Sequence, residues 1–380
     1  MLSTVLRVLS CGAEGGGYVA RALEEFANAI KADGVFARED AWMARKILKW
    51  LGITVAVLLI AVIAIAGIGS SLSLDRDYTH TNNTAALPLL SSELSSSSST
   101  PALVRISANG FEFRARVAGS SDDAPAVILL HGFPVTSAMW GPMIMPLANA
   151  GYRVIAFDQR GYSPGARPDE AGAYAIAELV SDVIAVADAV GVEKFHLIGH
   201  DWGSAVGWST VLSHPDRVVS WTGLSIAHPA AFFDALENDP DQQSRSSYFA
   251  LFTMPLVPEA LFTFNNLVVL RGLYSAMAPL EQAEYQTVFA EPRALTSALN
   301  WYREMDESVG ANPQLINETS TPTLFIWGNR DEAVGRTAIQ DQKKYMTGVY
   351  REIELDADHW LMSTHADEVT RAVLEHLNSN

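Results

Sequence analysis

From residue 103 to the C-terminus, short apolar runs alternate with stretches in which apolar residues recur every three or four positions. Short apolar runs indicate buried strands, and the second spacing indicates amphipathic helices. The predicted strands are residues 103–106 and 111–117, as a hairpin, then 126–130, 153–157, 195–198, 218–225, 323–327 and 350–355. The clearest predicted helices are 176–190, 204–213 and 366–377. This order predicts an α/β fold with a doubly wound, mostly parallel sheet.

Residues 228–312 interrupt the alternation. The segment has no strand-like run, holds prolines at positions 240, 255, 258 and 279, and is rich in aromatic residues. Because proline starts or breaks helices, several short helices are predicted here. We expect a helical cap, inserted after the sixth strand and lying over the carboxyl ends of the strands, where ligands bind in such folds. The core of the domain is then 102–227 together with 313–380.

Residues 50–74 contain no charged side chain and are almost wholly apolar. A helix over this stretch would be roughly 35 Å long, enough to cross a hydrocarbon core of about 30 Å. The flanking charges are Arg38, Arg45, Lys46 and Lys49 before the stretch, and Asp75, Arg76 and Asp77 after it. By the positive-inside rule, residues 1–49 are expected in the cytoplasm and the larger domain outside. A cleaved signal peptide is the alternative, although its apolar region would be shorter.

The serine-rich segment 75–101 predicts a flexible tether between this membrane helix and the α/β domain. The formal net charge of -17 argues against binding to nucleic acid, which needs clusters of Lys and Arg. The single cysteine, Cys11, excludes an internal disulfide. We expect no cofactor and no metal.

Asp201 stands in the most informative local pattern of the chain. The strand 195–198 is followed by Gly199-His-Asp201-Trp-Gly203 and then by a predicted helix. This strand, turn and helix form a nucleophile elbow, in which the central side chain is exposed at the top of the sheet. A carboxylate there needs no base and can attack an sp³ carbon to form an alkyl ester. The alternative is an aspartate that merely caps the N-terminus of a structural helix.

A second pattern, Gly161-Tyr-Ser163-Pro-Gly165, matches the G-x-S-x-G motif of serine esterases. The prolines that follow it, Pro164 and Pro168, prevent a helix from starting there. Ser163 is therefore predicted to lie in a loop, and Asp158 and Arg160 are expected to brace that loop rather than act in catalysis.

Five motifs occur in one order along the chain. They are His131-Gly-Phe-Pro134, Asp158-Gln-Arg-Gly161, Gly199-His-Asp-Trp-Gly203, Leu299-Asn-Trp-Tyr-Arg303 and His359-Trp360. In this order and near these spacings, residues 103–377 resemble the α/β-hydrolase epoxide hydrolases of the soluble type. The membrane segment and the tether lie outside the resemblance.

The resemblance implies a catalytic triad. Asp201 would be the nucleophile, His359 the base that activates water against the ester, and Asp331 the acid that orients His359. Glu332 is a neighbouring alternative to Asp331, although it would point to the other side of an extended strand. The family usually has glycine before the histidine. Asp358 stands there instead, and as a second carboxylate it would tend to raise the pKa of His359.

The resemblance also implies the groups that stabilise charge. The backbone N–H groups of Phe133 and Trp202 would form the oxyanion hole, and the Phe133–Pro134 bond is expected to be cis. Tyr248 and Tyr302 match the pair that protonates the epoxide oxygen. Such donors are needed because an alkoxide, unlike a halide, is a poor leaving group without a proton.

The expected function is therefore hydrolysis of apolar epoxides to vicinal diols by a membrane-tethered enzyme. A haloalkane or haloacid dehalogenase, or another ester-forming α/β-hydrolase, is the first alternative. Many dehalogenases have asparagine at the position of Phe133, and phenylalanine cannot hold a halide in its place. A non-catalytic binding protein on a hydrolase scaffold is the second alternative. The expected partners are a small apolar epoxide, water and the membrane.

Overall fold

The structure, a computed structural model, describes residues 100–119, 123–305 and 317–380 of the chain. The predicted segments 1–49 and 50–74, and nearly all of the tether 75–101, lie outside the described residues. Within the described part, no single helix is long and apolar enough to cross a membrane. One pair of consecutive helices, Pro240–Phe252 and Val257–Leu273, meets the length and composition criterion only when both are counted together.

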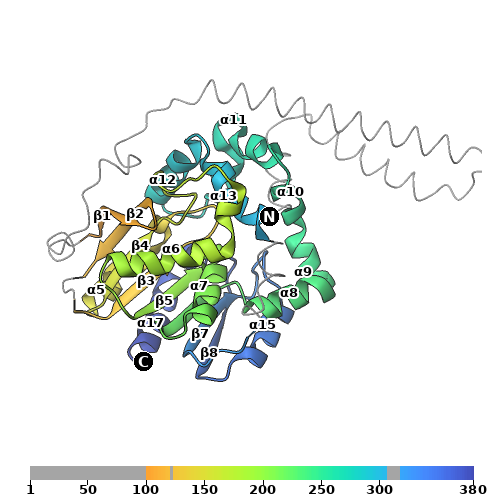
Figure 1. The fold of residues 1–380 in the computed structure, drawn as a ribbon. Helices are drawn as coiled ribbons and strands as arrows, with labels where there is room; N and C mark the ends of the chain where they lie inside the picture. The colour runs from red at the N-terminus through yellow and green to blue at the C-terminus, as the bar shows by residue number, and fades with distance from the viewer. Residues whose placement is uncertain (1–99, 120–122, 306–316) are drawn as a thin grey trace, which may run out of the picture. The chain divides into compact units, whose positions relative to one another are not determined.

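An eight-stranded sheet forms the centre of the fold, with strand order β1-β2-β4-β3-β5-β6-β7-β8 (Figure 1). The first three strands in this order pair antiparallel, and all later neighbours pair parallel. The strands are β1 (Ala102–Ala108), β2 (Phe111–Ala118), β3 (Ala126–Leu130), β4 (Arg153–Phe157), β5 (Phe195–His200), β6 (Val218–Leu224), β7 (Thr323–Gly328) and β8 (Tyr350–Leu355). The predicted α/β fold with a mostly parallel sheet is confirmed.

Side-chain burial explains why these runs form strands. Every residue of β3, β4, β5 and β7 is buried, as expected of strands that have helices on both faces. The edge strand β8 is only partly buried. The predicted bounds of β3, β4 and β8 agree with the structure to the residue.

Helices cover the sheet. They are α5 (Gly141–Asn149), α6 (Ile176–Ala189), α7 (Trp202–Ser213), α15 (Arg336–Asp341), α16 (Leu361–Thr364) and α17 (Ala366–Leu377), with 3₁₀ turns η3 (Ser137–Trp140), η4 (Ala171–Tyr174) and η7 (Gln342–Tyr345). Helices α6 and α7 pack against each other, and α5 packs against α17. In Figure 1, α6 and α7 lie side by side across the sheet.

Between β6 and β7 the described residues form helices and no strand. These are α8 (Pro229–Asn238), α9 (Pro240–Arg245), η5 (Ser246–Tyr248), α10 (Phe249–Phe252), α11 (Val257–Leu273), α12 (Pro279–Ala290) and α13 (Ala294–Arg303). Four of these helices have proline in their first turn, where its missing N–H costs nothing. The division of the chain into core and cap at residues 228 and 312 stays a prediction.

Helix α11 is not continuous. Two helical stretches within α11 are separated at Phe264–Leu267, where the backbone leaves the helical region. The φ angles of Asn265 and Asn266 are positive. Asparagine tolerates that conformation better than most residues, which explains a break at this pair.

Candidate active site

Asp201 occupies a strained turn between β5 and α7. Its φ of 53° and ψ of -123° lie in a region that non-glycine residues rarely adopt. The turn is tight enough that a Cβ on Gly203 would lie 2.1 Å from the carbonyl oxygen of Leu130. A Cβ on Gly132 would lie 2.3 Å from Oδ1 of Asp201. The glycines therefore let the nucleophile elbow approach the loop after β3.

The Asp201 side chain makes no capping hydrogen bond to α7, although Asp201 is the N-cap residue. Instead, its Oδ1 accepts a hydrogen bond of 2.7 Å from the N–H of Phe133. Its Oδ2 lies 3.6 Å from Nε2 of His359. The simple helix-capping interpretation of Asp201 therefore does not describe its side chain. The helix begins at Trp202, two residues before the predicted start.

His359 and Asp331 form a buried pair beside Asp201. Nδ1 of His359 lies 2.9 Å from Oδ2 of Asp331, which fixes the ring so that Nε2 faces Asp201. Asp331 Oδ1 accepts hydrogen bonds from the N–H groups of Ala333 and Val334, at 2.7 and 3.1 Å. The structure thus brings the three residues of the predicted triad together from loops after β5, β7 and β8.

The charges of the three groups depend on one another. Burial alone would raise the pKa of Asp331, but His359 and the N–H of Ala333 lower it to about 2. Burial likewise opposes the charge of Asp201, yet His359 and the N–H of Phe133 hold its pKa below the usual value. Burial lowers the pKa of His359, whereas Asp331 and Asp201 raise it to about 10. In the site without substrate, Asp201 and Asp331 are therefore ionised and His359 is protonated.

Tyr248 and Tyr302, the two tyrosines predicted in the cap, line the same cavity as Asp201. A cavity of about 680 Å³, including open solvent at its mouth, is lined by Asp201, Trp202, Tyr248, Tyr302, Phe232 and Phe249, among others. The rings of Tyr248 and Tyr302 lie 6.2 Å apart. Burial first, and the negative charge of Asp201, raise the pKa of each phenol well above its usual value. Both hydroxyls therefore keep their protons while Asp201 is ionised.

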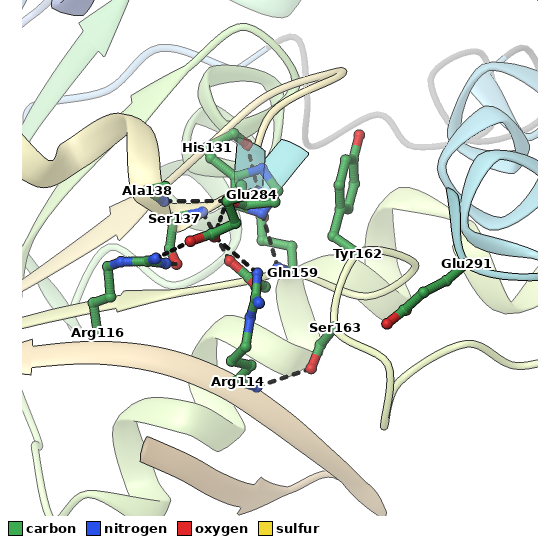
Figure 2. A network of polar contacts seen from close by, with 12 residues as sticks. Arg114, Arg116, His131, Ser137, Ala138, Gln159, Tyr162, Ser163, Glu284 and Glu291 are labelled. Atoms are coloured by element: carbon green, nitrogen blue, oxygen red, sulfur yellow. Dashed lines mark hydrogen bonds and ion pairs between the residues drawn. The ribbon is translucent and has the colours of Figure 1, made fainter. Parts of the chain in front are cut away.

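The loop after β3 supplies the N–H of Phe133. A network of hydrogen bonds and ion pairs holds this loop in place (Figure 2). Asp158, fully buried, pairs with Arg114 and accepts the N–H of Ser137 at 2.8 Å. Gln159 donates its backbone N–H to Nε2 of His131 at 3.0 Å. The Phe133–Pro134 bond is cis, as expected from the resemblance. Asp158 therefore has the predicted bracing role, although the loop that it contacts through Ser137 is the one after β3.

Glu284 of α12 joins this network from the cap. Its Oε1 accepts hydrogen bonds from Thr136 Oγ1 at 2.7 Å and from an Arg114 guanidinium nitrogen at 3.0 Å, and its Oε2 pairs with Arg116 (Figure 2). One carboxylate thus links a cap helix to β2 and to the loop that carries Phe133.

Three minor predictions have clear outcomes. Ser163 lies in a turn, where its hydroxyl accepts the N–H of Arg114 and donates to the carbonyl of Glu112, so it is not an activated nucleophile. Glu332 is exposed, and its neighbour Asp331 is the residue at His359. Asp358 Oδ1 accepts the N–H of Trp360, and the carboxylates that raise the pKa of His359 are Asp331 and Asp201.

Comparison with known proteins identifies the family. Residues 125–291 match the family model of the alpha/beta hydrolase fold. Epoxide hydrolase A of Mycobacterium tuberculosis is 33% identical over 314 residues, which cover 72% of this chain and 96% of that protein. The chain belongs to the epoxide hydrolases of the α/β-hydrolase fold.

Two further relatives agree with this assignment. AB hydrolase superfamily protein YfhM of Bacillus subtilis is 31% identical over 280 residues, which cover 72% of this chain and 97% of that protein. The crystal structure of epoxide hydrolase A from Mycobacterium thermoresistibile superimposes with a TM-score of 0.59 at 29% identity, and covers 73% of this chain and 98% of that one. The family predicted from the five motifs is confirmed.

Two residues of the cap that support the loop carrying Asp331 were not predicted from the sequence of this epoxide hydrolase. The buried amide of Gln242 accepts the N–H of Gly335 at 2.7 Å and donates to the carbonyl of Ala333 at 2.9 Å. Arg245 donates to the carbonyl of Asp331. No local motif marks Gln242 or Arg245. Their position at the start of the cap, shortly before Tyr248, was the only available signal.

Proposed function

We propose that the protein hydrolyses apolar epoxides to vicinal diols through an alkyl ester of Asp201. The observation that carries the proposal is the placement of one buried carboxylate between a backbone N–H donor, a histidine and two protonated phenols. The apolar lining of the cavity supports an apolar substrate. Trapping of the ester, described in the Discussion, tests the proposal.

In the first step, Oδ2 of Asp201 attacks an epoxide carbon, and the carbon–oxygen bond of the ring breaks. Tyr248 or Tyr302 gives a proton to the developing alkoxide. Oδ1 remains hydrogen bonded to the N–H of Phe133, which orients the carboxylate. As the ester forms, Asp201 loses its charge. Since that charge raises the pKa of both tyrosines, each becomes a better proton donor during ring opening.

In the second step, water attacks the ester carbonyl carbon and His359 takes its proton. The tetrahedral intermediate places negative charge on Oδ1, where the N–H of Phe133 already points, and we assign the N–H of Trp202 as the second donor. The bond between the carbonyl carbon and the alkyl oxygen then breaks. The alkyl oxygen takes the proton that remains on the added water oxygen, the diol leaves, and the Asp201 carboxylate is restored.

Ester formation also prepares His359 for its role as a base. In the free site, both Asp331 and Asp201 raise the pKa of His359. The ester has no charge, so only Asp331 remains to do so. The pKa of His359 therefore falls when the ester forms. The ring can then pass its proton through solvent to the phenolate left by ring opening, so that His359 is neutral when water attacks.

A pH dependence follows. Ester hydrolysis should become faster as pH rises through the pKa of His359 in the ester, which lies below the value of about 10 in the free site. Ester formation should stay level between about pH 5 and about pH 9, since Asp201 remains ionised and the phenols remain protonated. Single-turnover rates of the two steps measure both profiles. A hydrolysis rate that is flat across this range would contradict the base role of His359.

The tyrosines distinguish an epoxide from a halide. Tyr302→Phe and Tyr248→Phe should each slow ring opening by about 10- to 100-fold, and the double variant should be slower still, because a proton donor is lost. Tyr350→Phe, in β8 and outside the cavity, is the control. Release of free halide from a haloalkane, unaffected by Tyr302→Phe, would instead favour the dehalogenase alternative.

We further propose, from the sequence pattern alone, that the chain is a single-pass membrane protein. Residues 50–74 would be the transmembrane helix, with 1–49 in the cytoplasm and the catalytic domain outside, because basic residues precede the apolar stretch. Protease added to intact spheroplasts that express the full chain should remove the catalytic domain. Full protection from the protease would show that this orientation is wrong.

A further inference from the structure

His200 is the last residue of β5 and directly precedes Asp201. Its side chain is fully buried, and its Nε2 lies 2.9 Å from the backbone carbonyl oxygen of His359. The two imidazole rings are 4.6 Å apart at an angle of 51°. One strand end therefore carries both the nucleophile and a side chain that contacts the catalytic histidine.

The backbone of His359 depends on this contact. His359 lies in the loop between β8 and α16, where the carbonyl of Ala357 accepts the N–H of Arg330 and the N–H of Trp360 is bound by Asp358. Among the described residues, His200 is the one that forms a hydrogen bond with the main chain of His359. The Asp331 contact holds the ring at Nδ1, and the His200 contact holds the backbone from which the ring extends.

We propose that His200 is a positioning residue that keeps His359 in place for ester hydrolysis, an inference that rests on the proposed function. Attack by Asp201 does not use His359 as a base, so it tolerates a displaced ring. Water activation requires Nε2 within hydrogen-bond reach of a water beside the ester carbonyl. A shift of about 1 Å in such a group can cost roughly 100-fold in rate. The two half-reactions should therefore respond differently to loss of the His200 donor.

The charge state of His200 fits this role. Burial, and after it the positive charge of the neighbouring His359, lower its pKa to about 4. The ring is therefore neutral across the working pH range and carries a single N–H. An acceptor carbonyl at Nε2 places that hydrogen on Nε2. A neutral donor can hold the His359 backbone without placing a second positive charge beside the imidazolium.

The test separates the half-reactions in the full-length protein. His200→Phe and His200→Leu remove the donor, whereas His200→Gln keeps an N–H donor. With styrene oxide as the probe, quenched samples analysed by mass spectrometry give the rates of ester formation and ester decay. We expect the apolar variants to form the ester at close to the wild-type rate and to hydrolyse it about 10- to 100-fold more slowly. kcat and KM should then fall together, and His200→Gln should recover part of the loss.

His196→Phe is the matched control, since His196 lies on the same strand and is also buried, but bonds to Ser220. It should leave both steps unchanged. Wild-type ester decay in both apolar variants, or equal slowing by His196→Phe, would overturn the inference. If neither apolar variant folds, His200→Asn, whose shorter amide cannot reach the carbonyl, takes their place. Absence of any ester in the wild type and in His359→Gln would instead overturn the proposed function.

Discussion

Asp201→Asn is expected to form no alkyl ester and to lose roughly 10⁴-fold or more of the activity towards an aryl epoxide. The amide has nearly the shape of the carboxylate but cannot attack carbon as an anion. Activity is measured as diol release, and the ester as an increase in protein mass. Asp216→Asn, at an exposed position beyond the other end of α7, is the control and should behave as wild type.

A reaction in water labelled with a heavy oxygen isotope provides a second measurement of the attack by Asp201. In a single turnover of the wild-type protein, the oxygen gained by the diol comes from Asp201 and not from solvent. The diol should therefore be unlabelled, and the label should appear in the peptide that contains Asp201. Solvent label in the first-turnover diol would mean that water attacks the epoxide directly and that Asp201 acts as a base.

His359→Gln is expected to accumulate the ester. Ring opening needs only the Asp201 carboxylate and the phenols, so the variant should gain the mass of one substrate. Its ester decay should be slower by roughly 10²- to 10⁴-fold, the range expected for loss of a general base. The measurement is intact-protein mass spectrometry over time after mixing with excess styrene oxide. Steady-state turnover should fall by a similar factor.

His365→Gln is the control for this variant, because His365 lies nearby on the chain and contacts Thr364 rather than the triad. It should turn over substrate without accumulating a heavier species. An inactive His359→Gln protein that forms no ester, while remaining folded, would assign His359 to the first step and contradict the roles proposed here.

Much of the fold was predictable from local sequence. The apolar runs at β3 and β4 and the amphipathic spacing at α17 predicted the observed bounds, because each pattern is complete within a few residues. Asp201 was also identifiable locally, since an elbow is a strand, a tight turn and a helix in direct succession. Other boundaries were less accurate. β5 extends to His200, and α7 begins two residues earlier than predicted.

The supporting contacts of the site could not be predicted in this way. His200 and the carbonyl of His359 are 159 positions apart, and Thr136 and Glu284 are 148 apart. No single motif contains both members of either pair. Likewise, the sequence could not show that Asp358 would bind the backbone of Trp360, because the direction of a loop side chain depends on the turn around it.

The sequence by itself therefore determined the family, the order of the elements and the candidate nucleophile, all of which depend on short patterns or on several motifs in one order. The tertiary structure decided which side chains hold those groups in place and how their charges interact. Such contacts join segments from separate strands and from the cap. They form only when the sheet aligns the strand ends, and their distances and burial, which set the pKa of His359 and Asp331, exist only in the folded chain.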